Sequence, residues 1–329
     1  MKTLKFKLYN HQENRTLKRS INAAEVIYNR CIALHRRYYR MYGNHLNCAK
    51  LQRYTTKLRK RKPFWQTVGS QAVQELGQRI ERAYLLFFKP HKKGVSPPGF
   101  KKIKKYKSFT LKQAGYKFIG GNRVKIANRV YQYWNSREIE ETVKTLTIKR
   151  TALGELLMIV VVDDYREQTA KFKTGKIPGF DFGWKTFLTI SDGTKIELPQ
   201  FMKQSINAIK TASRQPSQKQ KESANRERAR KNLVCNHEDV ANCLCNWFWK
   251  MAHELTDKFD VLCFETLNIK GLQHLWGHKI SDLAFGECLQ ILQWIASKKG
   301  KQVVFLWRWY PSSKTCSDCG NVLERLYIG

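Results

Sequence analysis

The chain has 329 residues, enough for two domains with separate hydrophobic cores, and a formal net charge of +35. Residues 1–150 contain 36 of the 61 Lys and Arg but only seven carboxylates, a net charge of +29, whereas the remainder carries +6. This asymmetry predicts that one part binds a nucleic acid and the other acts on it. There is no apolar run of about 18 residues and no signal peptide, and the nine cysteines follow no disulfide pattern. We therefore expect a cytoplasmic protein without a membrane partner.

Residues 1–165 read as a basic β-domain with a helical insertion. Apolar and basic residues alternate over 2–8, which predicts a half-buried strand, and residues 15–90 have helical periodicity. Hairpins are expected at 116–126 and 143–162, around glycine-containing turns. Together, the first strand and these hairpins predict a small β-barrel into which the helices at about 15–90 are inserted.

Two basic segments of this domain, 57–62 and 89–108, are the candidate nucleic-acid contacts. In the second, which spans 89–108, Phe100, Ile103 and Tyr106 alternate with lysines, a pattern suited to stacking on bases while neutralising phosphates. A solvated charged surface is the alternative interpretation. The predicted nucleic-acid-binding residues are Lys57, Arg59, Lys60, Arg61, Lys62, Lys101, Lys102, Lys104, Lys105 and Lys107.

A polar linker is expected at 166–176, and a second domain begins at residue 177. Asp181 lies within an apolar strand, where an unpaired carboxylate is costly, and Glu265 ends another buried strand. Two strands that each place a carboxylate at the edge of one sheet are a recurring Mg²⁺ site, although pairing with an arginine is the alternative. Paired Mg²⁺ ions at such a site bind a phosphate and activate water.

The sequence Cys316-Ser-Asp-Cys319-Gly has the spacing of a zinc site. Structural zinc takes four ligands, and the residues after Cys319 include neither Cys nor His. The pair therefore predicts half of a Zn²⁺ site, with two ordinary thiols or a redox pair as the alternative.

Three motifs, in this order, resemble the TnpB (OrfB) family of bacterial insertion sequences, related to the type V CRISPR effectors. They are Gly-Phe-Asp181-Phe-Gly, Phe-Glu265-Thr-Leu-Asn-Ile-Lys-Gly and Tyr-Pro-Ser-Ser-Lys-Thr-Cys316-Ser-Asp-Cys319-Gly. The resemblance implies an α+β multidomain protein: a β-barrel with inserted helices, a RuvC-like α/β domain of RNase H fold at 177–310, and an incomplete C-terminal zinc ribbon at 311–329. It also implies a bacterial, transposon-encoded protein of DNA transposition and recombination, of the kind described as a transposase. With Mg²⁺ and a guide RNA from the transposon end, such a protein cuts a double-stranded DNA target that matches the guide.

The chain departs from this family at three places. The second cysteine pair and the segment with the family's third catalytic Asp are absent, and Leu244 and Cys245 stand where relatives resemble a basic pair. These departures predict a C-terminally truncated copy with impaired catalysis.

Three functions remain open on the sequence. The first is an RNA-guided, Mg²⁺-dependent DNA endonuclease with Asp181 and Glu265 as catalytic metal ligands. The second is an RNA- and DNA-binding protein that cannot cut. A transposase with an Asp-Asp-Glu triad is the third, but it needs another strand-borne Asp, and Asp239 and Asp257 lie in helical sequence.

Overall fold

The computed structural model describes residues 1–10, 14–89, 94–163, 174–183, 186–197, 199–266, 284–307, 315, 319 and 321–322. The chain divides into two compact units, Met1–Arg166 and Glu167–Gly329, each with its own hydrophobic core. Most of the expected linker, residues 166–173, lies outside the described part. All but four residues of the zinc ribbon expected at 311–329 also lie outside the described part.

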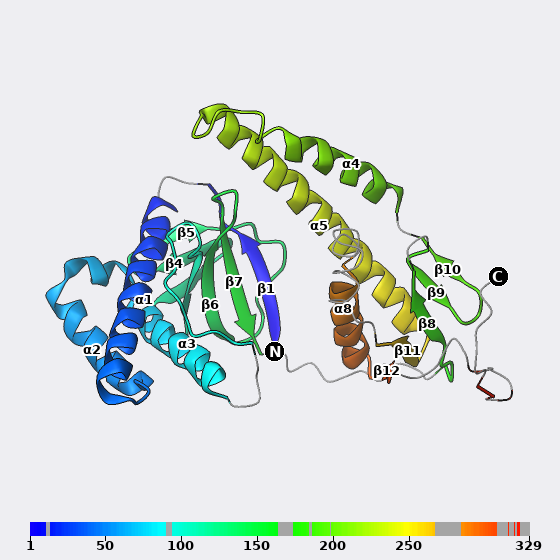
Figure 1. Ribbon diagram of the computed structural model, residues 1–329, viewed down its shortest axis with the longest axis horizontal. Helices are drawn as coiled ribbons and strands as arrows, with labels where there is room; N and C mark the ends of the chain where they lie inside the picture. The colour runs from blue at the N-terminus through cyan, green and yellow to red at the C-terminus, as the bar shows by residue number, and fades with distance from the viewer. Residues whose placement is uncertain are drawn as a thin grey trace. The chain divides into compact units, whose positions relative to one another are not determined.

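Two antiparallel sheets form the β part of the first unit (Figure 1). The four-stranded sheet has the order β1-β7-β6-β2, and the three-stranded sheet has the order β3-β4-β5. Leu4 and Phe6 are buried, while Lys5 and Lys7 between and beyond them are exposed, as the alternation predicts. The strands are β1 (Lys2–Lys7), β2 (Ser108–Leu111), β3 (Tyr116–Gly120), β4 (Arg123–Ile126), β5 (Arg129–Gln132), β6 (Val143–Arg150) and β7 (Leu156–Val162).

These sheets do not close into the expected barrel. In the described residues β1 and β2 are the edges of the four-stranded sheet, and the isolated bridge between Leu8 and Tyr133 joins that sheet to the region after β5. A barrel needs a continuous hydrogen-bonded ladder around its whole circumference, which one bridge does not supply. The sequence also failed to predict β5, because the turn before it uses Ala127 at a φ of 51° rather than a glycine.

The helical insertion packs on this β part through its apolar faces, and Figure 1 shows α1 and α3 beside the sheet strands. It consists of α1 (Asn14–Tyr42), α2 (Cys48–Arg61), the 3₁₀ turn η1 (Pro63–Thr67) and α3 (Ser70–Phe88). In α3 the apolar stripe predicted from the sequence is buried at Ala72, Val73, Leu76, Ile80 and Tyr84. The helical stripe therefore serves the core of the unit.

Buried His35 of α1 contacts half-buried His45 and a tyrosine of α3. His35 of α1 and His45, just before α2, are joined by a 2.9 Å hydrogen bond between His35 Nε2 and His45 Nδ1. The His35 ring also stacks on Tyr84 of α3, with 3.6 Å between ring centroids and 8° between planes. Burial, with a contribution from His45, lowers the pKa of His35 to about 4.

The second unit is a mixed sheet with helices. Its strand order is β10-β9-β8-β11-β12, in which β8, β11 and β12 run parallel and β8, β9 and β10 are antiparallel neighbours. The strands are β8 (Gly179–Phe182), β9 (Leu188–Ile190), β10 (Lys195–Ile196), β11 (Val261–Glu265) and β12 (Gln302–Leu306). The helices are α4 (Gln200–Arg214), α5 (Ala224–Lys258) and α8 (Phe285–Lys298). None of the helices in the described residues has the length and apolar character that a membrane crossing requires.

Candidate functional site

The two carboxylates singled out in the sequence lie on neighbouring parallel strands of the second unit. Asp181 is the third residue of β8, and Glu265 is the last residue of β11. The register pairs Gly179 with Cys263 and Phe180 with Phe264. One further step along both strands therefore sets Asp181 beside Glu265.

Packing on the opposite face fixes this arrangement. Phe180 and Phe264 are buried, and their rings stack with 4.9 Å between centroids and 16° between planes. Because successive strand residues point to opposite faces, Asp181 and Glu265 share the face away from these rings. The aromatic core that holds the two strands in register thus places both carboxylates on the same side of the sheet.

Both its surroundings and the charge of Glu265 act on the carboxyl of Asp181. Asp181 keeps more than a third of its surface exposed, yet the surrounding protein removes enough water from its carboxyl to raise its pKa, and the negative charge of Glu265 raises it further. The amide of Phe182 opposes this shift by donating a hydrogen bond to the carboxylate. A local excess of negative charge of this kind is relieved by a bound cation.

Gly183 follows β8 and lies close to the backbone of the segment that leads into β9. In the structure a Cβ at this position would lie 2.7 Å from the backbone oxygen of Thr186. The glycine is therefore required for the tight return of the chain toward β9, where its amide donates to the carbonyl of Phe187 at 3.3 Å.

Oxygen donors of two carboxylates fit a hard divalent cation such as Mg²⁺. No group of three or more metal-binding side chains occurs within the described residues. Of the predicted zinc ligands, Cys319 is exposed and Cys316 lies outside the described residues. An antiparallel bridge between Thr315 and Val322 encloses the segment that contains both cysteines.

The predicted nucleic-acid contacts lie in the first unit and form two groups. On α2 and just after it, Lys57, Lys60, Arg61 and Lys62 are exposed. Arg59 differs, because its guanidinium donates to the Val68 carbonyl at 2.5 Å and burial lowers its pKa. The first group therefore presents four exposed cations and one arginine that is held by a backbone carbonyl.

The second group is the segment 98–107, which we call the strap. Asn29 of α1 holds it by donating to the Lys101 carbonyl at 2.8 Å and accepting from the Lys101 amide at 2.9 Å. Tyr28 donates to the Gly99 carbonyl at 3.3 Å, and Arg150 donates to the carbonyls of two further strap residues. The strap lysines that were predicted to bind nucleic acid are all exposed: Lys101, Lys102, Lys104, Lys105 and Lys107.

The aromatic part of that prediction is wrong at one residue. Phe100 and Ile103 are 57% and 48% exposed, so both are accessible to a ligand. Tyr106 is only 4% exposed and packs on Tyr28 with ring centroids 5.7 Å apart. The alternation of aromatic and basic residues cannot reveal this burial, because helix α1 supplies the contact from a distant part of the chain.

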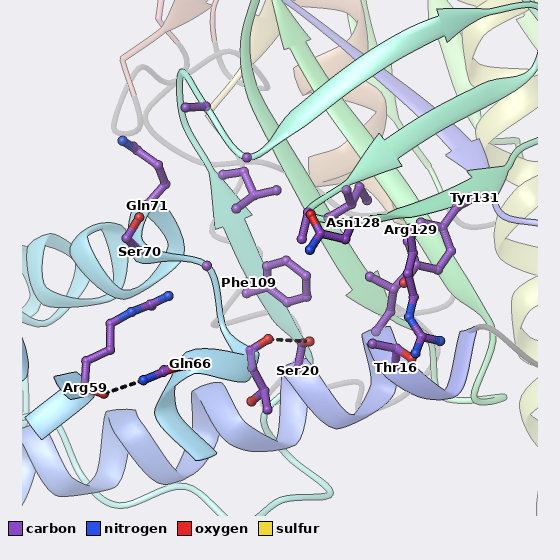
Figure 2. A pocket seen from close by; sticks show the side chains of 18 residues that line it. Thr16, Ser20, Arg59, Gln66, Ser70, Gln71, Phe109, Asn128, Arg129 and Tyr131 are labelled. Atoms are coloured by element: carbon purple, nitrogen blue, oxygen red, sulfur yellow. Dashed lines mark hydrogen bonds between the residues drawn. The ribbon is translucent and has the colours of Figure 1, made fainter. Parts of the chain in front are cut away.

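Sequence reasoning missed a cavity of about 490 Å³ in the first unit, between α1, the start of α3 and the strands. Figure 2 shows Arg59 and Arg129 on opposite sides of this cavity, with Phe109 between them. Gln71 and Asn128 add amide groups to the wall. We call it the Arg59 cavity. Two cations and two amides around an aromatic ring are groups that bind phosphates and base edges.

Family models match two segments of the chain. Residues 159–275 match the family OrfB_IS605, described as a probable transposase, and residues 285–328 match the family described as Cas12f1-like, TNB domain. A putative RNA-guided DNA endonuclease of Streptomyces pristinaespiralis is 26% identical over 334 residues, which cover 99% of this chain and 82% of that protein.

Other relatives match over shorter stretches. The putative RNA-guided DNA endonuclease InsQ of Escherichia coli (strain K12) is 24% identical over 204 residues, covering 62% of this chain and 50% of that protein. TnpB-like protein L79 of Acanthamoeba polyphaga mimivirus is 28% identical over 162 residues, covering 44% and 31%. The chain thus spans half of InsQ and about a third of L79.

The fold resembles that of Cas12f1 in its complex with sgRNA and target DNA. The TM-score is 0.61 at 12% identity, over 95% of this chain and 77% of that one. These observations define the class of the protein: it is an α+β protein with a strongly basic unit and with a carboxylate pair on a mixed sheet. The two family models and the relatives named as RNA-guided DNA endonucleases support the resemblance to the TnpB (OrfB) family that the sequence motifs indicate.

Proposed function

We propose that this chain is an RNA-guided DNA endonuclease whose catalytic residues are Asp181 and Glu265, in a RuvC-like domain. The pairing of β8 with β11 carries the proposal, because it sets the two carboxylates side by side on one face of the sheet. Asp181 and Glu265 would hold Mg²⁺, which supplies water activation and stabilisation of the leaving oxygen in phosphodiester hydrolysis. Cys316 and Cys319 would contribute two thiolates to Zn²⁺ in a separate ribbon.

The two carboxylates have distinct parts in this proposal. Asp181 comes from the middle of the sheet, where β9 pairs with it on one side through Thr189 and β11 lies on the other. Its raised pKa means that a cation must displace a proton more often here than at an isolated aspartate. Glu265 stands at the end of its strand, so its longer side chain reaches the same space from the strand terminus.

The basic unit would bind the guide RNA and the target DNA. Exposed lysines of this unit include those on α2 and on the strap, and the Arg59 cavity offers cations with amide groups beside them. Phosphate contacts of this kind supply affinity that decreases as salt increases. The relatives whose names describe RNA-guided endonucleases support this assignment.

The test is DNA cleavage by the full chain purified with its co-expressed RNA. RNA that copurifies is sequenced, and duplexes that match it are incubated with the protein and Mg²⁺. We expect cleavage by the unmodified chain and a loss of at least a hundredfold in Asp181→Asn, because removal of a single charge-stabilising group at a reaction centre costs roughly this much.

Asp192→Asn is the matched control. Asp192 is an exposed aspartate of the same unit that accepts a hydrogen bond from the Thr194 amide at 2.8 Å, and an asparagine oxygen can accept the same bond. If Asp181→Asn and Asp192→Asn cut equally well, the assigned site is wrong. If the unmodified chain binds matched DNA in a salt-dependent way and leaves it uncut, the protein is the nucleic-acid-binding alternative and not a nuclease.

A further inference from the structure

A second cavity of the first unit, of about 340 Å³, has lining residues different from those of the Arg59 cavity. It lies where the end of β1 meets residues 132–134 and the start of α1. None of the residues predicted from the sequence to bind nucleic acid lines it. Its most prominent side chain is Trp134, which is 56% exposed.

The backbone holds this indole in a fixed place. The Tyr9 amide donates to the Gln132 carbonyl at 2.9 Å, and the Trp134 amide donates to the Lys7 carbonyl at 2.8 Å. Leu8 and Tyr133, between them, form a β-bridge and are buried in the core. By strand alternation, Lys7, Tyr9 and Trp134 therefore share the outer face.

Tyr9 and Trp134 form a prebuilt aromatic stack on that face. Their ring centroids are 4.4 Å apart, with 22° between the ring planes. Tyr9 covers one face of the indole, and the exposure of Trp134 leaves room on the other. An aromatic ring that is already supported on one side loses little side-chain entropy when a planar ligand stacks on its free side.

Charge decides which planar ligand fits. Lys7 and Lys18 line the cavity, and Leu8 and Leu156 provide an apolar floor. Glu155 pairs with Lys7 at 2.7 Å at the rim and offsets its charge, whereas no carboxylate of the described residues pairs with Lys18. A flat aromatic group with an attached anion matches this set of side chains.

We infer that this cavity binds one unpaired nucleotide, with its base stacked on Trp134 and its phosphate near Lys18. Any of the bases can stack on an aromatic side chain, so the site would recognise that a nucleotide is unpaired and would not distinguish its base. The inference rests on the proposed function in one respect, namely that the first unit binds nucleic acid. It does not depend on cleavage.

The experiment uses the full chain and short single-stranded hexanucleotides with a central 2-aminopurine, in ribose and deoxyribose versions, and the same sequence as a duplex. Stacking on an indole quenches 2-aminopurine fluorescence, which reports the contact itself. We expect Trp134→Ala to abolish the quenching and to weaken single-strand binding roughly 5- to 150-fold, since stacking of one base is worth about this much. Trp134→Phe should keep most of both.

Two further variants sharpen the test. Lys18→Ala should reduce the slope of log affinity against log salt by about 0.7 for single strands, as the loss of one phosphate contact requires. Trp294→Ala removes a similarly exposed tryptophan, 42% exposed, from α8 of the other unit and should change nothing.

The outcomes separate cleanly. A larger effect of Trp134→Ala on the ribose or on the deoxyribose probe identifies the source of the nucleotide, and both results support the site. Unchanged quenching in Trp134→Ala overturns it, and so does an equal loss of single-strand and duplex binding. If the site fails while guided cleavage is retained, the proposed function stands without it.

Discussion

Buried His35 of the helical insertion makes the stability of the protein depend on pH, and His35→Gln removes this contribution. The folded chain keeps His35 neutral because burial lowers its pKa from 6.5 to about 4. The unfolded chain takes up a proton as the pH falls through 6.5. The folded state therefore loses stability from pH 6.5 downward, until His35 itself is protonated near pH 4.

The size of the effect follows from the two pKa values. Linkage between them gives a loss of about 2 kcal/mol between pH 7.5 and pH 5, and about 3 kcal/mol in total. Only 2% of His35 is exposed, so solvent does not screen the penalty. A glutamine at this position can still hydrogen-bond to His45 Nδ1, but it does not titrate.

Urea unfolding followed by circular dichroism at both pH values measures this difference. The quantity of interest is the change in unfolding free energy between pH 7.5 and pH 5 in the unmodified chain, minus the same change in His35→Gln. The subtraction cancels the carboxylates common to both chains. His237→Gln, which replaces an exposed histidine of α5, is the control and should retain the full pH dependence. An identical pH dependence in the unmodified chain and in His35→Gln would refute the reasoning.

Two further substitutions test local features. Gly183→Ala should destabilise the protein by about 1–3 kcal/mol in thermal unfolding, because the added Cβ would lie 2.7 Å from the backbone oxygen of Thr186. Gly99→Ala is the control and should be nearly neutral, because the space around its Cβ is open. Asn29→Ala removes both hydrogen bonds to the backbone of Lys101 and should weaken binding of a DNA duplex severalfold. The slope of log affinity against log salt should not change, since the lysines remain. Filter binding at several salt concentrations measures the affinity and the slope, and an unchanged affinity would mean that the order of the strap does not matter for binding.

Much of the fold follows from local patterns in the sequence. The alternation that buries Leu4 and Phe6, the helical stripe of α3 and the hairpin of β6 with β7 all lie where the patterns predict them. Each depends on the periodicity of apolar residues within one element. The family assignment likewise follows from short motifs around Asp181 and Glu265.

The remaining features depend on contacts between distant parts of the chain. No sequence pattern indicates that β5 follows a left-handed Ala127, or that Tyr106 packs on Tyr28 instead of facing a ligand. The Tyr9–Trp134 stack joins residues 125 positions apart, which only the bridge after β1 brings together. For the carboxylates, the sequence supplies the residue types and the strands, and the register supplies their adjacency.

Metal binding at Asp181 and Glu265 tests the central claim most directly. Calorimetric titration of the full chain with Mn²⁺, a cation with the ligand preferences of Mg²⁺, should show binding that weakens at least tenfold in both Asp181→Asn and Glu265→Gln. It should weaken also as the pH is lowered, because protons compete for a carboxyl whose pKa is raised. Equal Mn²⁺ affinity in the unmodified chain and in both variants would contradict the assignment of these carboxylates as a metal site.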